Sequence, residues 1–325
     1  MLKWHKPVSE EMTLSKIMAN QAIQAFLLVV LSLTACQSAA GNQADQAAGS
    51  LPTVLATTTF LADIAQNVAG DRLHVESLLP IGVDPHSYEP APSDIVRVAR
   101  STVLITNGAG FEGFLQKLLD NAGGQRLVIA SAAGLTSRVP GTGEVVDSGE
   151  SDPHFWLDPS KVVTYVANIR DGLSQADPAG AQSYAANAAA YTTQIKDLDR
   201  WITEQVQQIP AARRLLVTNH ESFGYFADRY GLRVVGAIVP SVSSSAAPSA
   251  QQTARLIDQI QATGAPAIFL EMGTNPQLAQ QIARETGIKV VTGLYSHSTT
   301  EAGGPAPTYI DMMKENVRAI VGALK

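Results

Sequence analysis

The sequence contains a single cysteine, Cys36, among 325 residues. One cysteine cannot form a disulfide within the chain, and it cannot supply the several thiolates of a structural zinc site. A metal site built on several thiolates is therefore excluded.

Charged residues are scarce as well. They make up 16% of the chain, and the net charge is −6. This balance gives no sign of the basic surface that nucleic-acid binding requires, so we expect no nucleic-acid partner. Hydrophobic residues amount to 45%, and the length is sufficient for two domains of ordinary size, each with a core.

The apolar run near the N-terminus is too short to span a bilayer, because residues 25–33 supply only nine residues. Such a run is typical of the central region of an export signal. It leads into Leu33-Thr34-Ala35-Cys36, which looks like a bacterial lipobox. We therefore expect residues 1–36 to be a lipoprotein signal peptide and Cys36 to be lipidated. The protein would then be exported and anchored on the outer face of the cytoplasmic membrane, or would be periplasmic.

Two alternatives stay open for this segment: an ordinary signal peptide with an incidental cysteine, or a buried apolar segment. Glu10 and Glu11 are unusual ahead of such a run, and a start of translation at Met12 would remove them. Residues 37–50 are rich in Ala, Gly, Gln and Ser, the composition of a flexible tether.

From Leu51 onward, short apolar runs alternate with amphipathic segments. The predicted strands include 215–218 and 267–270, and the predicted helices include 111–121, 159–173 with Asp158 as its N-cap, and 222–230. Continuous apolar runs are typical of parallel strands covered on both faces, and the alternation indicates an α/β fold. Residues 178–208 lack glycine, apart from Gly180 near the start, and predict one long helix of roughly 45 Å. We expect an N-terminal α/β lobe over 51–177, a connecting helix over 178–209 and a C-terminal α/β lobe over 210–325.

The chain has six histidines. His5 lies in the expected signal region and His74 within a predicted strand, which leaves four that could form a site. His86 and His154 occur in two Asp-Pro-His units, and His220 and His297 follow predicted strands.

Ligands bind outside the carboxyl ends of the strands in open α/β sheets. Two such edges facing each other would bring two histidines from each lobe to one metal site in the cleft between them. The alternative is that the four histidines are separate structural residues.

Three stretches carry a resemblance to a known family. Residues 83–90, 153–159 and 217–226 resemble, in the right order, the first three ligand motifs of the metal-binding substrate-binding lipoproteins of bacterial ABC importers, the zinc and manganese group. The resemblance covers Leu51 to Lys325. It implies two similar α/β lobes with mostly parallel sheets, a long rigid helix and one metal in the cleft. It also implies a binding protein and not an enzyme, expected to be a monomer, with a membrane permease and a cytoplasmic ATPase as partners.

The fourth ligand of that family is usually an aspartate, and His297 stands in its place. His297 could ligate, water could fill the position, or Glu301 could substitute. Manganese-type members resemble the third motif with a glutamate where His220 stands. Because imidazole suits Zn²⁺ and Mn²⁺ prefers oxygen, we expect Zn²⁺ as the transported ligand, with Mn²⁺ or Fe²⁺ as the alternative. The loop at 139–151 is acidic and lacks histidine, so no zinc-gathering loop is predicted.

Imidazole must be neutral to ligate, so metal affinity should fall below roughly pH 6.5. A zinc-dependent hydrolase is the enzyme alternative, with Glu221 beside His220 as its base, although the chain has no His-Glu-x-x-His motif. Adhesion is at most a secondary role. Phe155 and Trp156 are expected to pack within a lobe.

Overall fold

The computed structural model describes residues 1–2, 50–139 and 151–325. The chain divides into two units, Met1–Leu51 and Pro52–Lys325. The expected signal peptide beyond residue 2, Cys36 and all of the tether but Ser50 lie outside the described residues, as do residues 140–150 of the acidic loop. Among the described helices, none is both long and apolar enough to cross a membrane.

The first lobe of the second unit is built on a four-stranded parallel sheet with the order β2-β1-β3-β4. Its central strands are buried along their whole length, as the continuous apolar runs predict. The strands are β1 (Val54–Ala56), β2 (Val75–Ser77), β3 (Val103–Thr106) and β4 (Leu127–Ala130).

The second lobe repeats this topology, with four parallel strands in the order β6-β5-β7-β8. Counting strands along each lobe, both sheets read 2-1-3-4. This identity confirms the prediction of two similar α/β lobes. The strands are β5 (Leu215–His220), β6 (Arg233–Val239), β7 (Ala267–Glu271) and β8 (Lys289–Leu294).

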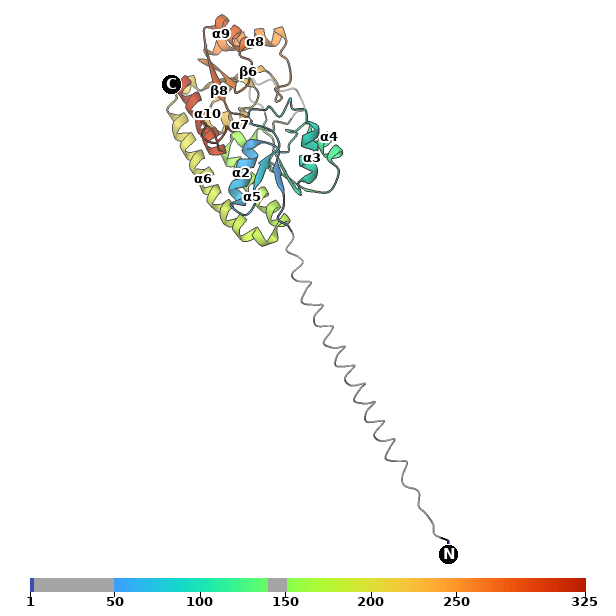
Figure 1. The fold of residues 1–325 in the computed structure, drawn as a ribbon. Helices are drawn as coiled ribbons and strands as arrows, with labels where there is room; N and C mark the ends of the chain where they lie inside the picture. Colours follow the sequence, from blue (N-terminus) through green and yellow to red (C-terminus); the bar gives the residue numbers. More distant parts are fainter. Residues whose placement is uncertain (3–49, 140–150) are drawn as a thin grey trace. The chain divides into compact units, whose positions relative to one another are not determined.

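Helices connect the strands and cover the sheets (Figure 1). In the first lobe they are α2 (Thr59–Ala69), α3 (Pro92–Arg100), α4 (Leu115–Ala122) and α5 (Pro159–Ala176), with a short 3-10 turn at Phe155–Leu157. In the second lobe they are α7 (Gly224–Tyr230), α8 (Ala250–Thr263), α9 (Gln277–Thr286) and α10 (Tyr309–Leu324), and a 3-10 turn at Ala211–Arg213 precedes β5.

The long connecting helix is α6 (Ala181–Gln207), which packs against α2 and α5 of the first lobe and against α7 and α10 of the second. Its 27 residues correspond to about 40 Å. Its buried residues recur every three or four positions, so one face of the helix contacts both lobes. These residues are Tyr184, Ala188, Tyr191, Ile195, Leu198, Ile202 and Val206.

Several predicted helix starts are wrong by two to four residues. The long helix begins at Ala181 and not at Pro178, because Pro178–Gly180 forms a separate 3-10 turn. The helix predicted from Phe111 begins at Leu115, since the Glu112 carboxylate accepts the backbone N–H groups of Asn107 and Gly108 and holds a turn there.

The helix predicted from Ser222 begins at Gly224. Strand β5 is correspondingly longer than predicted, because it continues from Thr218 to His220. The strand therefore carries a histidine directly to its carboxyl end.

Aromatic side chains join the two lobes beneath this strand edge. Trp156 is fully buried and stacks on Phe60 at 4.5 Å between ring centroids. Its indole N–H donates to the Ser296 carbonyl oxygen of the second lobe at 2.7 Å. The Tyr309 hydroxyl of α10 donates to the Trp156 carbonyl oxygen at 2.6 Å. Phe155 is also buried in the core, so both aromatic residues have the structural role that the sequence predicts.

Candidate metal centre

The four histidines singled out in the sequence lie together. His86, His154, His220 and His297 each offer one ring nitrogen, and these nitrogens all lie within 4.8 Å of one another. Two residues come from each lobe, at the loops or strand ends where the carboxyl edges of the sheets meet. The four histidines are therefore not separate from one another in the structure, and their role as metal ligands stays a prediction.

The first-lobe histidines are presented by two turns of the same kind. In each Asp-Pro-His unit the aspartate Oδ1 accepts the backbone N–H of the histidine two residues later. The distances are 2.9 Å for Asp84 and His86, and 3.0 Å for Asp152 and His154. Because proline fixes the residue between them, the histidine is presented from a stiff turn.

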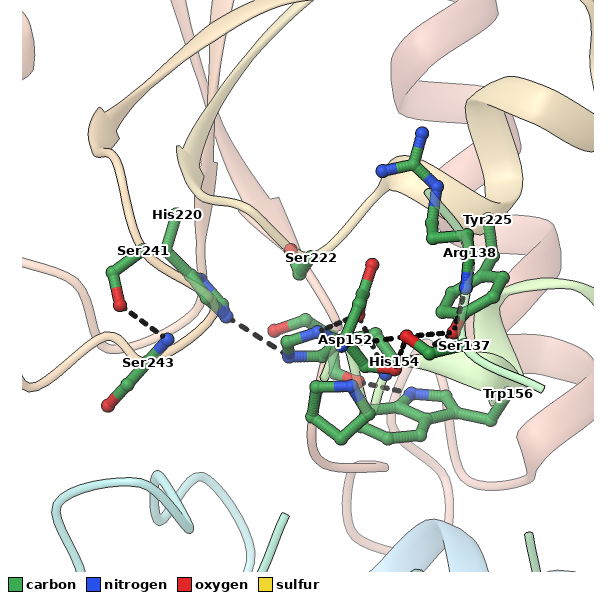
Figure 2. A network of polar contacts seen from close by, with 12 residues as sticks. Ser137, Arg138, Asp152, His154, Trp156, His220, Ser222, Tyr225, Ser241 and Ser243 are labelled. Carbon is green, nitrogen blue, oxygen red and sulfur yellow. Dashed lines mark hydrogen bonds and ion pairs between the residues drawn. The ribbon is translucent and has the colours of Figure 1, made fainter. Parts of the chain in front are cut away.

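Asp152 also contacts the ring of His154, whose Nδ1 lies 2.9 Å from the same Oδ1 (Figure 2). The Asp152 carboxylate is acceptor-only when ionised, so it favours the tautomer with a proton on Nδ1 and a free Nε2. The Tyr225 hydroxyl of α7 in turn donates to the Asp152 carbonyl oxygen at 2.8 Å. The second lobe thus holds the turn that orients a first-lobe histidine.

The Nε2 atom of His154 lies at the centre of the cluster. It is 3.4 Å from His86 Nε2 and 3.3 Å from His220 Nε2. A ring nitrogen either donates or accepts, so His154 Nε2 cannot donate to one of these neighbours and accept from the other. Direct hydrogen bonds therefore do not satisfy all three rings. The Nε2 atom of His297 is buried and has no hydrogen-bond partner among the described residues.

Glu271, at the end of β7, was not anticipated from the sequence. Its Oε1 lies 2.7 Å from His220 Nδ1, a close contact that lacks hydrogen-bond geometry, and its Oε2 lies 3.5 Å from His297 Nδ1. One signal was available, because Glu271 directly follows the predicted strand 267–270, as His220 follows 215–218. The sequence did not indicate that β5 and β7 are neighbours in the sheet.

The surroundings shift the protonation of these groups in opposite directions. Burial lowers the pKa of His86 to about 4, aided by the neighbouring charge of His220, and burial also lowers the pKa values of His154 and His297. Burial acts the same way on His220, but the Glu271 carboxylate outweighs it and raises the His220 pKa. For Glu271, the His220 charge outweighs burial and holds the carboxyl pKa well below its usual range.

Burial raises the pKa of Asp152 to about 7, against the lowering effect of the His154 backbone N–H.

Because burial lowers the pKa values of His86, His154 and His297, these three imidazoles are neutral at neutral pH, the state that a metal requires. The expected fall in metal affinity below roughly pH 6.5 stays a prediction.

Two cavities are lined by histidines of the cluster. One of about 390 Å³ is lined by His297 and Glu271 together with Asp84 and Ser244. The other, of about 610 Å³, is lined by His86 and by residues of the first lobe such as Phe114. His86 is half-buried, whereas the other three histidines are buried. The cluster is therefore bordered by two cavities, one at His297 and one at His86.

Other residues named from the sequence lie elsewhere. Glu301 is exposed and does not belong to the cluster of ligand atoms. Glu221 is buried but lines a separate cavity of about 80 Å³ with Arg255. His74 is exposed, directly before β2. Neither alternative carboxylate is therefore placed where it could substitute for His297 or serve a metal as a base.

Comparison with known proteins gives consistent matches along the chain. Residues 54–323 match the family model described as zinc-uptake complex component A periplasmic. The manganese-binding lipoprotein MntA of Halalkalibacterium halodurans is 33% identical over 299 residues, covering 92% of this chain and 97% of that protein. The iron-binding protein YfeA of Yersinia pestis is 35% identical over 267 residues, covering 82% and 84%.

Solved structures give the same result. The periplasmic zinc-binding protein TroA from Treponema pallidum is 28% identical and superposes with a TM-score of 0.76, covering 85% of this chain and 99% of TroA. A manganese-bound periplasmic metal-binding protein from Candidatus Liberibacter asiaticus, an S38A mutant, is also 28% identical with a TM-score of 0.76, covering 84% and 99%.

Proposed function

Because the chain belongs to the zinc-uptake complex component A periplasmic family, we propose that it captures one divalent transition-metal ion outside the cytoplasm and delivers it to an ABC-type importer. The family and these relatives are binding components of metal uptake and not enzymes. The zinc-dependent hydrolase alternative is therefore set aside. Adhesion has no observation in its support and is not proposed.

The spacing of the imidazole nitrogens is the observation that carries the proposal. In a regular tetrahedron with metal–nitrogen bonds of about 2.0–2.1 Å, the ligand atoms lie about 3.3–3.4 Å apart. The Nε2 atoms of His86 and His220 lie 3.4 Å and 3.3 Å from that of His154. Both distances match the separation that a tetrahedral ion needs, and all four ring nitrogens lie within 4.8 Å of one another. The Nε2 of His297, which has no hydrogen-bond partner among the described residues, is available as the fourth ligand.

We assign Zn²⁺ as the preferred ion. The four ligand atoms are all imidazole nitrogens, and no carboxylate belongs to the set among the described residues. Imidazole suits Zn²⁺, which accepts tetrahedral nitrogen, whereas Mn²⁺ favours oxygen ligands. The alternative is Mn²⁺ or Fe²⁺, which the names of MntA and YfeA favour.

The partners follow from the same class of importer. We propose that a membrane permease and its cytoplasmic ATPase receive the ion, and that the protein acts as a monomer. A lipid at Cys36 would keep it at the outer face of the membrane, as the lipoprotein name of MntA suggests.

A competition titration tests the proposal. Purified metal-free protein is titrated with Zn²⁺ and with Mn²⁺ against a chromophoric chelator. One Zn²⁺ per chain, bound more tightly than Mn²⁺, is the expected result, and His154→Ala should abolish tight binding. Stronger binding of Mn²⁺ would overturn the zinc assignment, and no stoichiometric binding of either ion would overturn the function.

A further inference from the structure

One buried carboxylate serves both histidines of the second lobe. Glu271 Oε1 lies 2.7 Å from His220 Nδ1, and its Oε2 accepts the Ser296 hydroxyl at 2.6 Å. Ser296 Oγ lies in turn 3.1 Å from His297 Nδ1. The Ser222 hydroxyl also donates to Oε1, at 3.2 Å.

We propose that Glu271 is a positioning residue that fixes both second-lobe imidazoles with their Nε2 atoms free for the metal. This inference rests on the proposed function, because it assigns a role toward the same ion. It goes further in stating that two of the four ligands depend on one carboxylate that does not itself belong to the ligand set.

The reason lies in the hydrogen-bonding capacity of each group. An ionised carboxylate can only accept, so the 2.7 Å approach of His220 Nδ1 to Oε1 requires a proton on that nitrogen. The Ser296 hydroxyl uses its single proton on Oε2, so its oxygen must accept from His297, which therefore carries a proton on Nδ1. In the metal-loaded protein both imidazoles then keep the proton on Nδ1 and present Nε2 to the ion. Groups that hydrogen-bond to metal-ligating side chains in this way orient the ligands and raise their basicity.

Glu271 also supplies negative charge. Four neutral imidazoles leave the two charges of the ion uncompensated, and no carboxylate belongs to the ligand set among the described residues. The Glu271 carboxylate is buried beside the cluster and accepts the Ser222 and Ser296 hydroxyls, so its negative charge offsets part of the charge of the ion without occupying a coordination position. The site thus keeps four nitrogen ligands.

Glu271→Gln gives a sharp test because glutamine has one acceptor and one donor where glutamate has two acceptors. Only one of the two imidazoles can then keep its Nδ1–H toward residue 271. The other must accept at Nδ1, either directly or through Ser296, and its proton moves to Nε2. A protonated Nε2 cannot ligate, so the variant should hold the ion through three imidazoles.

The experiment compares purified wild-type protein, Glu271→Gln and Glu112→Gln. Glu112 is a matched control because it is also a buried carboxylate, and it binds Thr57 and the backbone of Asn107 and Gly108. Zinc affinity is measured by competition. Co²⁺ absorption reports coordination number, and ¹⁵N NMR of the imidazoles in the zinc-loaded protein reports which nitrogen carries the proton.

We expect Glu271→Gln to lose about 10- to 100-fold in zinc affinity, the usual effect of removing an outer partner. Its Co²⁺ spectrum should lose tetrahedral intensity, and one imidazole should carry its proton on Nε2. Glu112→Gln should match the wild type in all three. Unchanged imidazole tautomers in Glu271→Gln, or an equal loss in Glu112→Gln, would overturn the inference.

If Glu271→Gln does not fold, Ser296→Ala tests the same relay, because it should disturb His297 and leave His220 unchanged. An unaltered His297 would then overturn the inference. A failure of the proposed function looks different, since the wild type itself would not bind one zinc ion.

Discussion

At the scale of single residues, metal choice depends on which atoms surround the ion. The four imidazoles offer nitrogen alone, and His297 lies with its Nδ1 3.5 Å from the Glu271 carboxylate. An oxygen ligand at position 297 would change both the ligand set and the local charge.

We therefore predict that His297→Asp narrows the preference for Zn²⁺ over Mn²⁺ by about 10-fold, since carboxylate oxygen suits Mn²⁺ better than imidazole does. Competition titrations with both ions measure the ratio. His74→Asp makes the same substitution at an exposed histidine outside the cluster and should leave the ratio unchanged. An unaltered ratio in His297→Asp would mean that residue 297 does not contact the ion.

The convergence of the four histidines could be predicted, because each one either follows a strand or occurs in a rigid Asp-Pro-His turn. Those are local features of the sequence. The roles of Glu271 and Ser296 could not, since they depend on β5, β7 and the end of β8 lying side by side, and no local pattern states which strands become neighbours.

At the scale of elements, hydrophobic patterns predicted the strands and helices. The residue at which a helix starts depends on hydrogen bonds from side chains in the preceding turn. Asp158 was predicted to cap the helix at 159–173, and its side chain accepts the Ser160 N–H at the start of α5. The start of α4 was wrong because the Glu112 carboxylate binds back to the backbone, a contact that helical periodicity does not reveal.

The junction of α5 and α6 is held by Asp177. Its carboxylate accepts hydrogen bonds from Arg72 Nη2 at 2.7 Å and from the Tyr184 hydroxyl at 2.5 Å. The bond from the Arg72 guanidinium lowers the pKa of Asp177 to about 2, in spite of partial desolvation. An aspartate in an unfolded chain has a pKa of about 3.9.

The folded state therefore binds the Asp177 proton more weakly than the unfolded state. Its contribution to stability is complete above about pH 4 and is lost as the pH falls toward 2. We predict that Asp177→Asn lowers the free energy of unfolding at pH 7, and that the difference from wild type shrinks as the pH falls below 4.

Urea unfolding of the metal-free protein at several pH values measures this difference. The exposed Asp258→Asn on α8 is the matched control and should change stability little at any pH. If the Asp177→Asn difference stayed constant down to pH 2.5, the ion pair with Arg72 would not be its cause.

At the scale of the whole molecule, the two lobes share one core and one cluster of histidines. Bonds such as Trp156 Nε1 to the Ser296 carbonyl join them beneath the cluster, and α6 packs on both. A metal held by two ligands from each lobe would add a further link that exists only in the folded state.

We thus predict that Zn²⁺ stabilises the protein by mass action, by about 2.7 kcal/mol at a free concentration of 100 times Kd. For the length of the folded unit, that corresponds to a rise in Tm of roughly 4–5 °C. Differential scanning calorimetry with and without Zn²⁺ measures it. His154→Ala should show no such rise, and an equal rise in that variant would place the ion elsewhere.

The coordination of zinc by these four residues is the central claim, and a crystal structure of the zinc-loaded protein at the zinc absorption edge tests it most directly. We predict one anomalous peak, bound at about 2.0–2.1 Å by nitrogens of His86, His154, His220 and His297 in a tetrahedron. A peak at any other place would contradict the claim. So would a site in which His297 points away and water or Glu301 fills the fourth position.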